Sequence, residues 1–160
     1  MITAACYFHQ PIVGYSHQRM DDFSAWIGET VQVAQAEMRT WALLPNHYHL
    51  LVKTQSILIL LKSLGRLHGR SSYLWNGEEN TRGRQVWTNA AETWMRSERH
   101  FWATLNYIHH NPVKHGHVSQ MSDWKWSGFS AFKKSVGKDF AHEIWEKYPI
   151  KNYGDSWDRD

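Results

Sequence analysis

Alternation of side chains over residues 47–53 constrains the fold of this 160-residue chain more than any other feature. Successive side chains of a β-strand point to opposite faces, so His47 and His49 would lie on one face. Tyr48 and Leu50 would then lie on the other face and enter a core. We therefore predict a strand that presents two imidazoles side by side. Imidazole nitrogens are common ligands of divalent ions, so this pair is a candidate metal site.

Length and composition favour one domain over residues 1–160 and exclude several other classes of protein. The chain is long enough to bury a core, and its hydrophobic fraction of 42% excludes a disordered chain. A net charge of +3 permits a nucleic-acid partner without requiring one. Cys6 is the single cysteine, which excludes a disulfide framework within the chain. We expect no membrane segment and no signal peptide, and hence a cytoplasmic protein.

The remaining pattern predicts alternating strands and helices. The expected strands cover residues 1–8, 41–44, 47–53 and, as one or two short pieces, 85–95. The expected helices run from Asp21 or Asp22 to about residue 38, over 57–73 behind Ser56, from Ser97 or Glu98 to Pro112, and over 140–147. This order matches the ferredoxin-like split βαβ fold. We predict an α+β sandwich whose central antiparallel sheet carries the histidines, with about 113–160 as a C-terminal extension packed on it.

The third predicted helix carries a tyrosine outside its core stripe. At about 100° per residue, Phe101, Leu105 and Ile108 fall on one face. Tyr107 and Asn111 are four residues apart and are neighbours on a flanking face. Tyr107 could therefore project toward a site, with the carboxamide oxygen of Asn111 as a third ligand for a hard cation. The alternatives are that Tyr107 only packs and that Asn111 only ends the helix, and the spacing does not decide between them.

A metal site and a distant tyrosine suggest an enzyme that breaks DNA through a phosphotyrosine bond. Tyrosine has a pKa of about 10 and is a poor nucleophile at neutral pH. A divalent ion would polarise the scissile phosphate, and covalent attack would conserve the phosphodiester bond energy for rejoining. Two alternatives stay open: a metal-dependent phosphodiesterase that activates a water, and a DNA-binding protein that has lost catalysis.

Three motifs resemble those of single-tyrosine transposases. Residues 45–51, PNHYHLL, resemble the HUH motif, in which a bulky hydrophobic residue separates two histidines. Residues 107–116, YIHHNPVKHG, resemble the tyrosine helix, and residues 123–129, DWKWSGF, resemble a tryptophan-rich signature further on. Together, and in the same order, they resemble the REP-associated tyrosine transposases, a branch of the IS200-like superfamily.

The resemblance implies a strand transferase, active as a monomer or a homodimer, on single-stranded DNA that forms hairpins of repetitive extragenic palindromes. By motif position, Tyr107 would be the nucleophile that forms a 5′-phosphotyrosine and releases a 3′-hydroxyl. His47, His49 and Asn111 would hold the metal, expected to be Mg²⁺ or Mn²⁺. Gly128 stands where the family more often has a second serine.

Basic residues outside these motifs are candidate DNA contacts. Three of them recur every four residues on the second helix, where they could line a phosphate backbone or form a solvated face. Others lie in the polar loop after that helix and directly after the tyrosine helix, where loop packing is an alternative for the histidine. Trp75 and Trp157 could stack on bases if they are exposed. The candidate DNA contacts are Lys62, Arg66, Arg70, Arg82, Arg84, Lys114 and His115.

Overall fold

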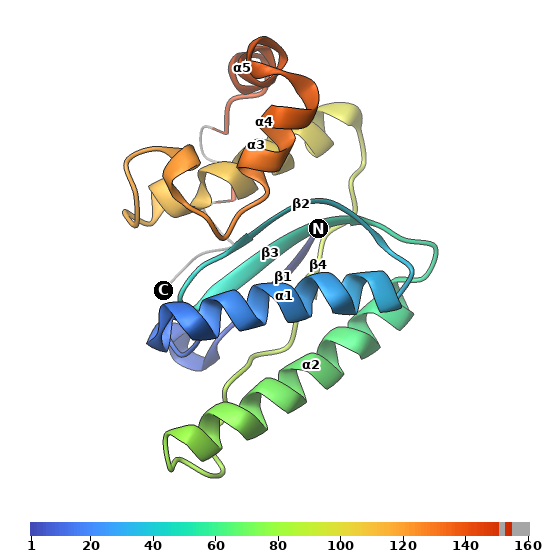
Figure 1. The fold of residues 1–160 in the computed structure, drawn as a ribbon. Helices are drawn as coiled ribbons and strands as arrows, with labels where there is room; N and C mark the ends of the chain where they lie inside the picture. Colours follow the sequence, from blue (N-terminus) through green and yellow to red (C-terminus); the bar gives the residue numbers. More distant parts are fainter. Residues whose placement is uncertain (151–152, 155–160) are drawn as a thin grey trace.

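Four strands form one antiparallel sheet in the computed structural model, which describes residues 1–150 and 153–154. The order β2-β3-β1-β4 is the ferredoxin-like order, so the predicted α+β class is confirmed (Figure 1). The strand with the histidines lies between two neighbours, as predicted, and spans the predicted residues. The strands are β1 Ile2–Ala5, β2 Glu37–Leu43, β3 His47–Lys53 and β4 Ala91–Glu92.

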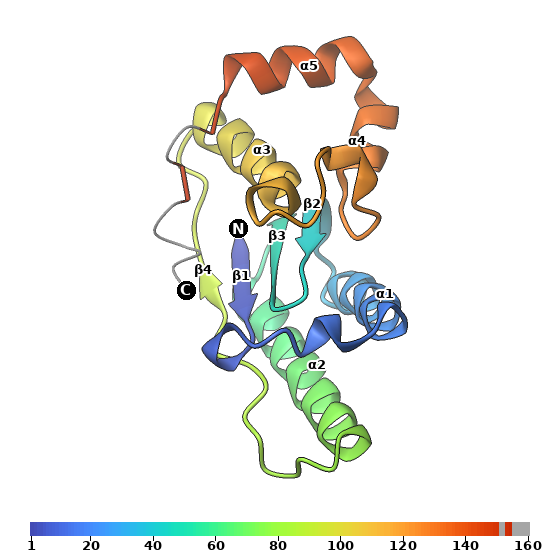
Figure 2. The ribbon, with the colours of Figure 1, turned by 90° about the vertical axis from the view of Figure 1, so that its left-hand side faces the viewer.

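Helices cover both faces of the sheet. Two long helices lie on one face, and three helices lie on the other, where α4 and α5 pack beyond α3 (Figure 1 and Figure 2). The helices are α1 His17–Val33, α2 Ile57–Glu78, α3 Glu98–Lys114, α4 Phe129–Val136 and α5 Lys138–Lys147. No helix in the described part of the chain is long and apolar enough to cross a membrane.

Each face of β3 enters a different cluster of buried side chains. Tyr48 and Leu50 pack with Phe23 of α1 in the larger apolar core. Leu51 faces the opposite way and packs with Leu105 of α3. The alternation predicted for this strand is therefore present. Because β3 is central, both of its faces are buried and its backbone is fixed from both sides.

Serine side chains begin the three longest helices. The Ser56 and Ser97 hydroxyls accept hydrogen bonds from backbone N–H groups in the first turns of α2 and α3, as the sequence predicts. The predicted start of α1 at Asp21 or Asp22 is wrong, because Ser16 caps that helix five to six residues earlier. Its predicted end at residue 38 is also wrong, because Gln35 has a φ of 52° and turns the chain into β2.

Several other boundaries differ from the prediction. The first strand ends at Ala5, because the chain turns through a 3-10 helix, Tyr7–His9, in which Phe8 has a positive φ. The helix α3 continues past Pro112 to Lys114: a proline in the last turn removes only one N–H donor. The helix α2 extends to Glu78, and α4 was not predicted at all.

The tryptophan-rich segment lies along the outer edge of β2. The Leu43 N–H donates to the Trp126 carbonyl over 2.9 Å, and the Gly128 N–H donates to the Trp41 carbonyl over 2.8 Å. A Cβ at Gly128 would lie 2.6 Å from Oγ1 of Thr40, so this close approach requires glycine. The segment thereby pairs an edge strand that would otherwise be open.

Candidate active site

The two histidines of β3 lie next to each other and are buried. The ring centroids of His47 and His49 are 5.0 Å apart, and strands on both sides hold their backbone. Both side chains point to the α3 face of the sheet. Tyr48, between them, packs in the larger core on the opposite face, and Leu51, two residues after His49, packs against α3. A central strand is a rigid support for such a pair.

A neighbouring side chain holds Nδ1 of each ring. Asn46 Oδ1 lies 2.8 Å from Nδ1 of His47, and the Asn46 amide itself donates to the carbonyl of His9 over 3.1 Å. Thr3 Oγ1 lies 2.8 Å from Nδ1 of His49. Outer partners of this kind fix the orientation of metal-ligating histidines.

Residues of α3 complete the site from the other side. Asn111 Oδ1 lies 3.0 Å from Nε2 of His47, and the ring centroid of Tyr107 lies 5.3 Å from that of His49. Tyr107 and Asn111 occupy successive turns of one helix face, and both are fully buried. The structure thus gathers four predicted residues from two elements that lie about sixty residues apart in sequence.

Two predicted DNA contacts border this group. The Lys114 ammonium lies 5.3 Å from the ring centre of Tyr107. The His115 ring lies 5.0 Å from that of His47. A cation therefore stands beside the tyrosine, and a third imidazole stands beside the histidine pair.

Residues Tyr153 and Gly154 cover the tyrosine. A Cβ at Gly154 would lie 2.3 Å from Cε2 of Tyr107, so the backbone there packs directly against the ring. The Tyr153 ring lies 6.0 Å from that of Tyr107, and its hydroxyl is hydrogen-bonded to Thr104. Burial raises the pKa of Tyr153. Tyr107 consequently has no exposed surface in this conformation.

Comparison with known proteins places this chain in a family. No protein-family model matches the chain. The REP-associated tyrosine transposase of Escherichia coli (strain K12) is 30% identical over 122 residues, which cover 76% of this chain and 66% of that protein. The putative REP-associated tyrosine transposase of Haemophilus influenzae is 27% identical over 163 residues, covering 88% of this chain and 85% of that protein. The chain belongs to the REP-associated tyrosine transposases.

A solved structure supports the same fold for this transposase. It is described as a REP-associated tyrosine transposase bound to a REP hairpin, and it matches with a TM-score of 0.63 at 21% identity. The match covers 93% of this chain and 81% of the other. At that identity the likeness concerns the fold, and the site rests on the geometry described above.

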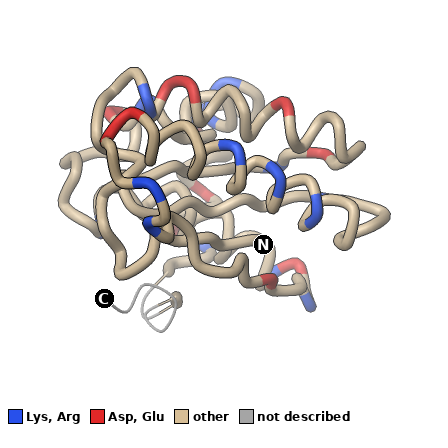
Figure 3. Tube along the Cα trace, turned by 90° about the horizontal axis from the view of Figure 1, so that it is seen from below, with Lys and Arg blue, Asp and Glu red and all other residues tan. Residues whose placement is uncertain are grey.

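The other predicted DNA contacts of the transposase lie on the α1/α2 side of the sheet, away from the histidines. Two of the three stripe residues on α2, Arg66 and Arg70, line a shallow cavity against α1, where the Arg70 guanidinium lies over the ring of Trp26. Figure 3 views this side of the molecule, with Lys and Arg positions along it. The stripe consists of Lys62, Arg66 and Arg70.

Arg82 and Arg84 make structural contacts near the end of α2. The Arg82 guanidinium donates to the Tyr73 carbonyl over 2.7 Å, and Arg84 forms an ion pair with Glu79 over 2.9 Å. The same glutamate pairs with the buried Arg19 of α1. The structure therefore does not bring these arginines to the candidate active site.

The aromatic stacking candidates have a clear outcome in one case. Trp75 is buried in the larger core beside Phe23, so it does not meet the condition of exposure and cannot stack on a base. Trp157 lies outside the described residues.

Sequence reasoning missed the supporting residues of the site. For Asn46, an amide directly before the first histidine is a usable signal. Thr3 could be found only from the strand register, which pairs it with His49. Tyr153 carries no recognisable signal, because its contact with α3 depends on the path of the C-terminal segment.

The donor set for a metal is limited. In residues 1–150 and 153–154, no group of three or more His, Cys, Asp or Glu is placed to hold an ion. A site on this face would therefore depend on the carboxamide of Asn111 as well as the two imidazoles. His109, on the same helix, is hydrogen-bonded to Thr40 instead, and burial lowers its pKa to about 3.

Proposed function

We propose that this chain is a strand transferase that binds single-stranded, palindromic REP-type hairpin DNA. It would cleave and rejoin that DNA through a 5′-phosphotyrosine on Tyr107. One observation carries the proposal: a tyrosine and an asparagine from α3 meet a buried histidine pair from β3 in a single site. The description of the solved relative as bound to a REP hairpin supports the hairpin as substrate.

We propose further that His47, His49 and Asn111 hold one divalent ion, Mg²⁺ or Mn²⁺. The Asn46 amide donates to His9, so its oxygen faces Nδ1 of His47. A neutral His47 then donates its one proton to Asn46, and the lone pair of its Nε2 faces Asn111 Oδ1 at 3.0 Å. An imidazole nitrogen and a carboxamide oxygen that face each other would both be donors to a divalent cation, so this pair would suit a shared ion. A doubly protonated His47 is the alternative, and metal titration distinguishes the two.

The reaction would exchange one phosphodiester for another. Tyr107 Oη loses its proton and bonds to phosphorus, the bond from phosphorus to the 3′-oxygen breaks, and the departing oxygen takes up a proton as a 3′-hydroxyl. A bound divalent ion polarises the phosphate and stabilises charge on the departing oxygen. The Lys114 ammonium, beside the tyrosine ring, would stabilise the negative charge on the phosphate oxygens. Rejoining is the reverse attack by a 3′-hydroxyl on the phosphotyrosine.

Burial gives the site its selectivity for rejoining over hydrolysis. The side chains of His49, Tyr107 and Asn111 have no exposed surface, and such burial would protect a covalent intermediate from water until a 3′-hydroxyl arrives. The same burial requires a conformational step, because DNA reaches Tyr107 only when Tyr153 and Gly154 move aside.

The test uses end-labelled hairpins from the repeats of the host genome, incubated with protein and Mn²⁺ and resolved on a denaturing gel. We expect a covalent protein–DNA adduct that Tyr107→Phe abolishes. A phosphodiesterase that uses water would cleave without an adduct, and Tyr107→Phe would keep that activity. A binding protein without catalysis would shift the hairpin on a native gel and form no adduct. Either of these results contradicts the proposal.

A further inference from the structure

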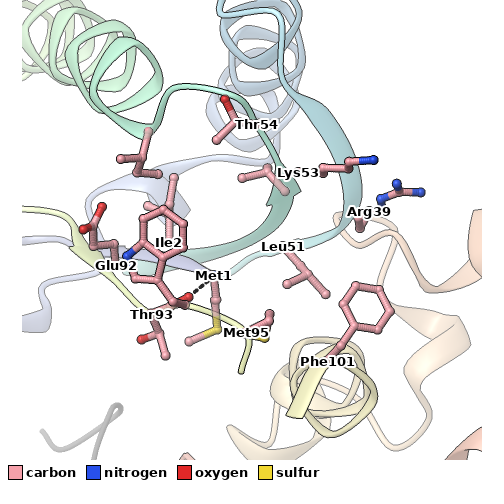
Figure 4. A pocket seen from close by; sticks show the side chains of 13 residues that line it. Met1, Ile2, Arg39, Leu51, Lys53, Thr54, Glu92, Thr93, Met95 and Phe101 are labelled. Carbon is pink, nitrogen blue, oxygen red and sulfur yellow. Dashed lines mark hydrogen bonds between the residues drawn. The ribbon is translucent and has the colours of Figure 1, made fainter. Parts of the chain in front are cut away.

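A cavity of about 430 Å³ opens at the end of β3 away from His47, where Ile57 of α2 and Phe101 of α3 both line it (Figure 4). Its apolar walls come from Leu51 of β3, from Met95, which precedes α3, and from Phe101 of α3. The volume falls within the range of small-molecule and nucleotide sites. Two of the elements that line it, β3 and α3, also build the candidate active site.

A β-bulge places a cation at this cavity. Met38 pairs with Val52 and Thr40 pairs with Leu51, so Arg39 is an extra residue in β2. Thr40 faces α3, where it is hydrogen-bonded to His109. In a regular strand the neighbouring Arg39 would point to the opposite face, but the bulge lets both side chains point toward α3. Arg39 lines the cavity as a result.

A second cation joins the first on the same side of the cavity. Arg39 and Lys53 both line the cavity, and in the view of Figure 4 their charged ends point to one side, with Glu92 on the other. The contact between Arg39 and Glu37, 2.8 Å long, joins two exposed side chains. An exposed pair of this kind contributes little stability, so an anion could readily replace it.

An exposed indole also lines the cavity. Trp94 follows β4 and leaves 67% of its surface exposed while bordering the cavity. The other tryptophans that the structure describes are buried or half-buried. A solvent-exposed aromatic face beside an apolar slot and two cations is the combination that binds single-stranded nucleic acid, by base stacking and phosphate contact.

We propose that this cavity binds one unpaired nucleotide of the DNA strand that carries the scissile phosphate. The base stacks on Trp94 against the apolar wall, and its phosphate lies at Arg39 and Lys53. The Glu92 carboxylate, on the opposite side, accepts a hydrogen bond from an amino group of the base. The assignment rests on the proposed function, because it takes the occupant to be the strand that is cut.

The distance to the active site suits this assignment. Lys53 lies four positions after His49 along β3, which corresponds to a distance of about 13 Å at about 3.3 Å per residue. A strand with about 3.4 Å per nucleotide covers that distance in a few nucleotides. The cavity would therefore fix which phosphate reaches Tyr107 by holding a base a few positions away.

The experiment compares two DNA probes by fluorescence anisotropy: a hairpin alone, and the same hairpin with a short single-stranded extension. With wild-type protein, we expect the extension to tighten binding. Trp94→Ala should remove that gain, which stacking puts at roughly tenfold, while Trp94→Phe should keep most of it. Arg39→Ala should reduce the gain as well. Tyr73→Ala, an exposed aromatic on α2, and Lys134→Ala, an exposed cation on α4, are the matched controls and should keep it.

Photo-crosslinking locates the base independently of affinity. An extension with one 4-thiothymidine, moved stepwise along the strand, should crosslink to the tryptic peptide of residues 85–96, and only from one or two positions. A crosslink at Trp94 together with loss of the gain in Trp94→Ala supports the site.

The outcomes separate the inference from the proposed function. If wild-type protein binds neither probe, both are overturned. If it binds the hairpin but the extension adds nothing, or if Trp94→Ala keeps the gain, the nucleotide site is wrong while hairpin binding stands. Crosslinks confined to other peptides also overturn the site.

Discussion

The two faces of the central sheet are equally buried but were assembled under different constraints. On the α1/α2 face, Tyr48 and Leu50 join an apolar core, where almost any close-packed arrangement lowers the free energy. On the α3 face, His47 and His49 need a polar partner at each ring, and those partners come from β1, a turn and α3. The comparison teaches that burial alone does not mark a core: the α3 face is buried and polar because its contacts serve a site.

The largest expected effect comes from the polar face. His49→Ala should reduce the Mn²⁺-dependent adduct by more than about a thousandfold, since it would remove a proposed metal ligand and a ring that contacts Tyr107. The measurement is adduct yield against time, with circular dichroism to verify folding. If a folded His49→Ala variant forms the adduct at a normal rate, the histidine pair is not the metal site.

The apolar face should respond in stability instead. Leu50→Ala should lower the free energy of unfolding by about 2–5 kcal/mol, because it leaves a cavity in the larger core. Urea denaturation measures this. Leu51→Ala, the next residue and on the other face, should cost a similar amount and should also lower adduct yield, because Leu51 supports α3. Equal adduct yields for the two folded variants would remove the functional distinction between the faces.

The outer partner of the proposed metal site should have a smaller effect on metal binding. Asn46→Ala should weaken Mn²⁺ binding by about 10- to 100-fold, because His47 would lose the amide that orients its ring. Calorimetric titration measures the affinity without DNA. The matched control is Asn89→Ala, an exposed asparagine that should bind Mn²⁺ like the wild type. An unchanged affinity in Asn46→Ala would contradict the proposed orientation.

Acid should destabilise the apolar face through a half-buried histidine. His68 lies between Tyr48 and Trp87, and burial lowers its pKa to about 4. In the unfolded chain it takes up a proton near pH 6.5. Its contribution is therefore complete above pH 6.5 and is lost as the pH falls toward 4, at up to about 1.4 kcal/mol per pH unit.

Urea denaturation between pH 7.5 and 4.5 measures that loss. The slope in this window should be smaller in His68→Phe, which removes the titrating ring from the core. His142→Gln, at an exposed histidine of α5, should keep the wild-type slope. An unchanged slope in His68→Phe would assign the acid sensitivity to other groups.

Periodicity predicted most of the fold. The alternation over residues 47–53 gave β3 with the correct bounds, and the serine caps gave the starts of α2 and α3. The order of elements then gave the class. The end of α1 was wrong because Gln35 adopts a positive φ that its residue type does not signal. The helix α4 was missed because its short apolar face makes sense only against the rest of the C-terminal segment.

The site was predictable in its parts and not in its surroundings. The same-face argument placed His47 with His49, and the four-residue spacing placed Tyr107 with Asn111. Neither argument could show that the two pairs meet, since that depends on how α3 crosses the sheet. The contact of Tyr153 with Tyr107 depends on long-range packing and left no periodic signal. The basic stripe on α2 showed the opposite failure: its spacing was correct, but a helix pattern does not say which side of a sheet the helix covers.

The most direct test of the account compares the two tyrosines that are fully buried on opposite faces of the sheet. Tyr107→Phe and Tyr48→Phe each remove one hydroxyl, and the adduct formed with a labelled hairpin and Mn²⁺ is measured for both. The account predicts that Tyr107→Phe forms no adduct. Tyr48→Phe should form it at close to the wild-type rate, with a loss of only about 1 kcal/mol of stability from the hydrogen bond to His68. An adduct in Tyr107→Phe that equals that of Tyr48→Phe would contradict the central claim.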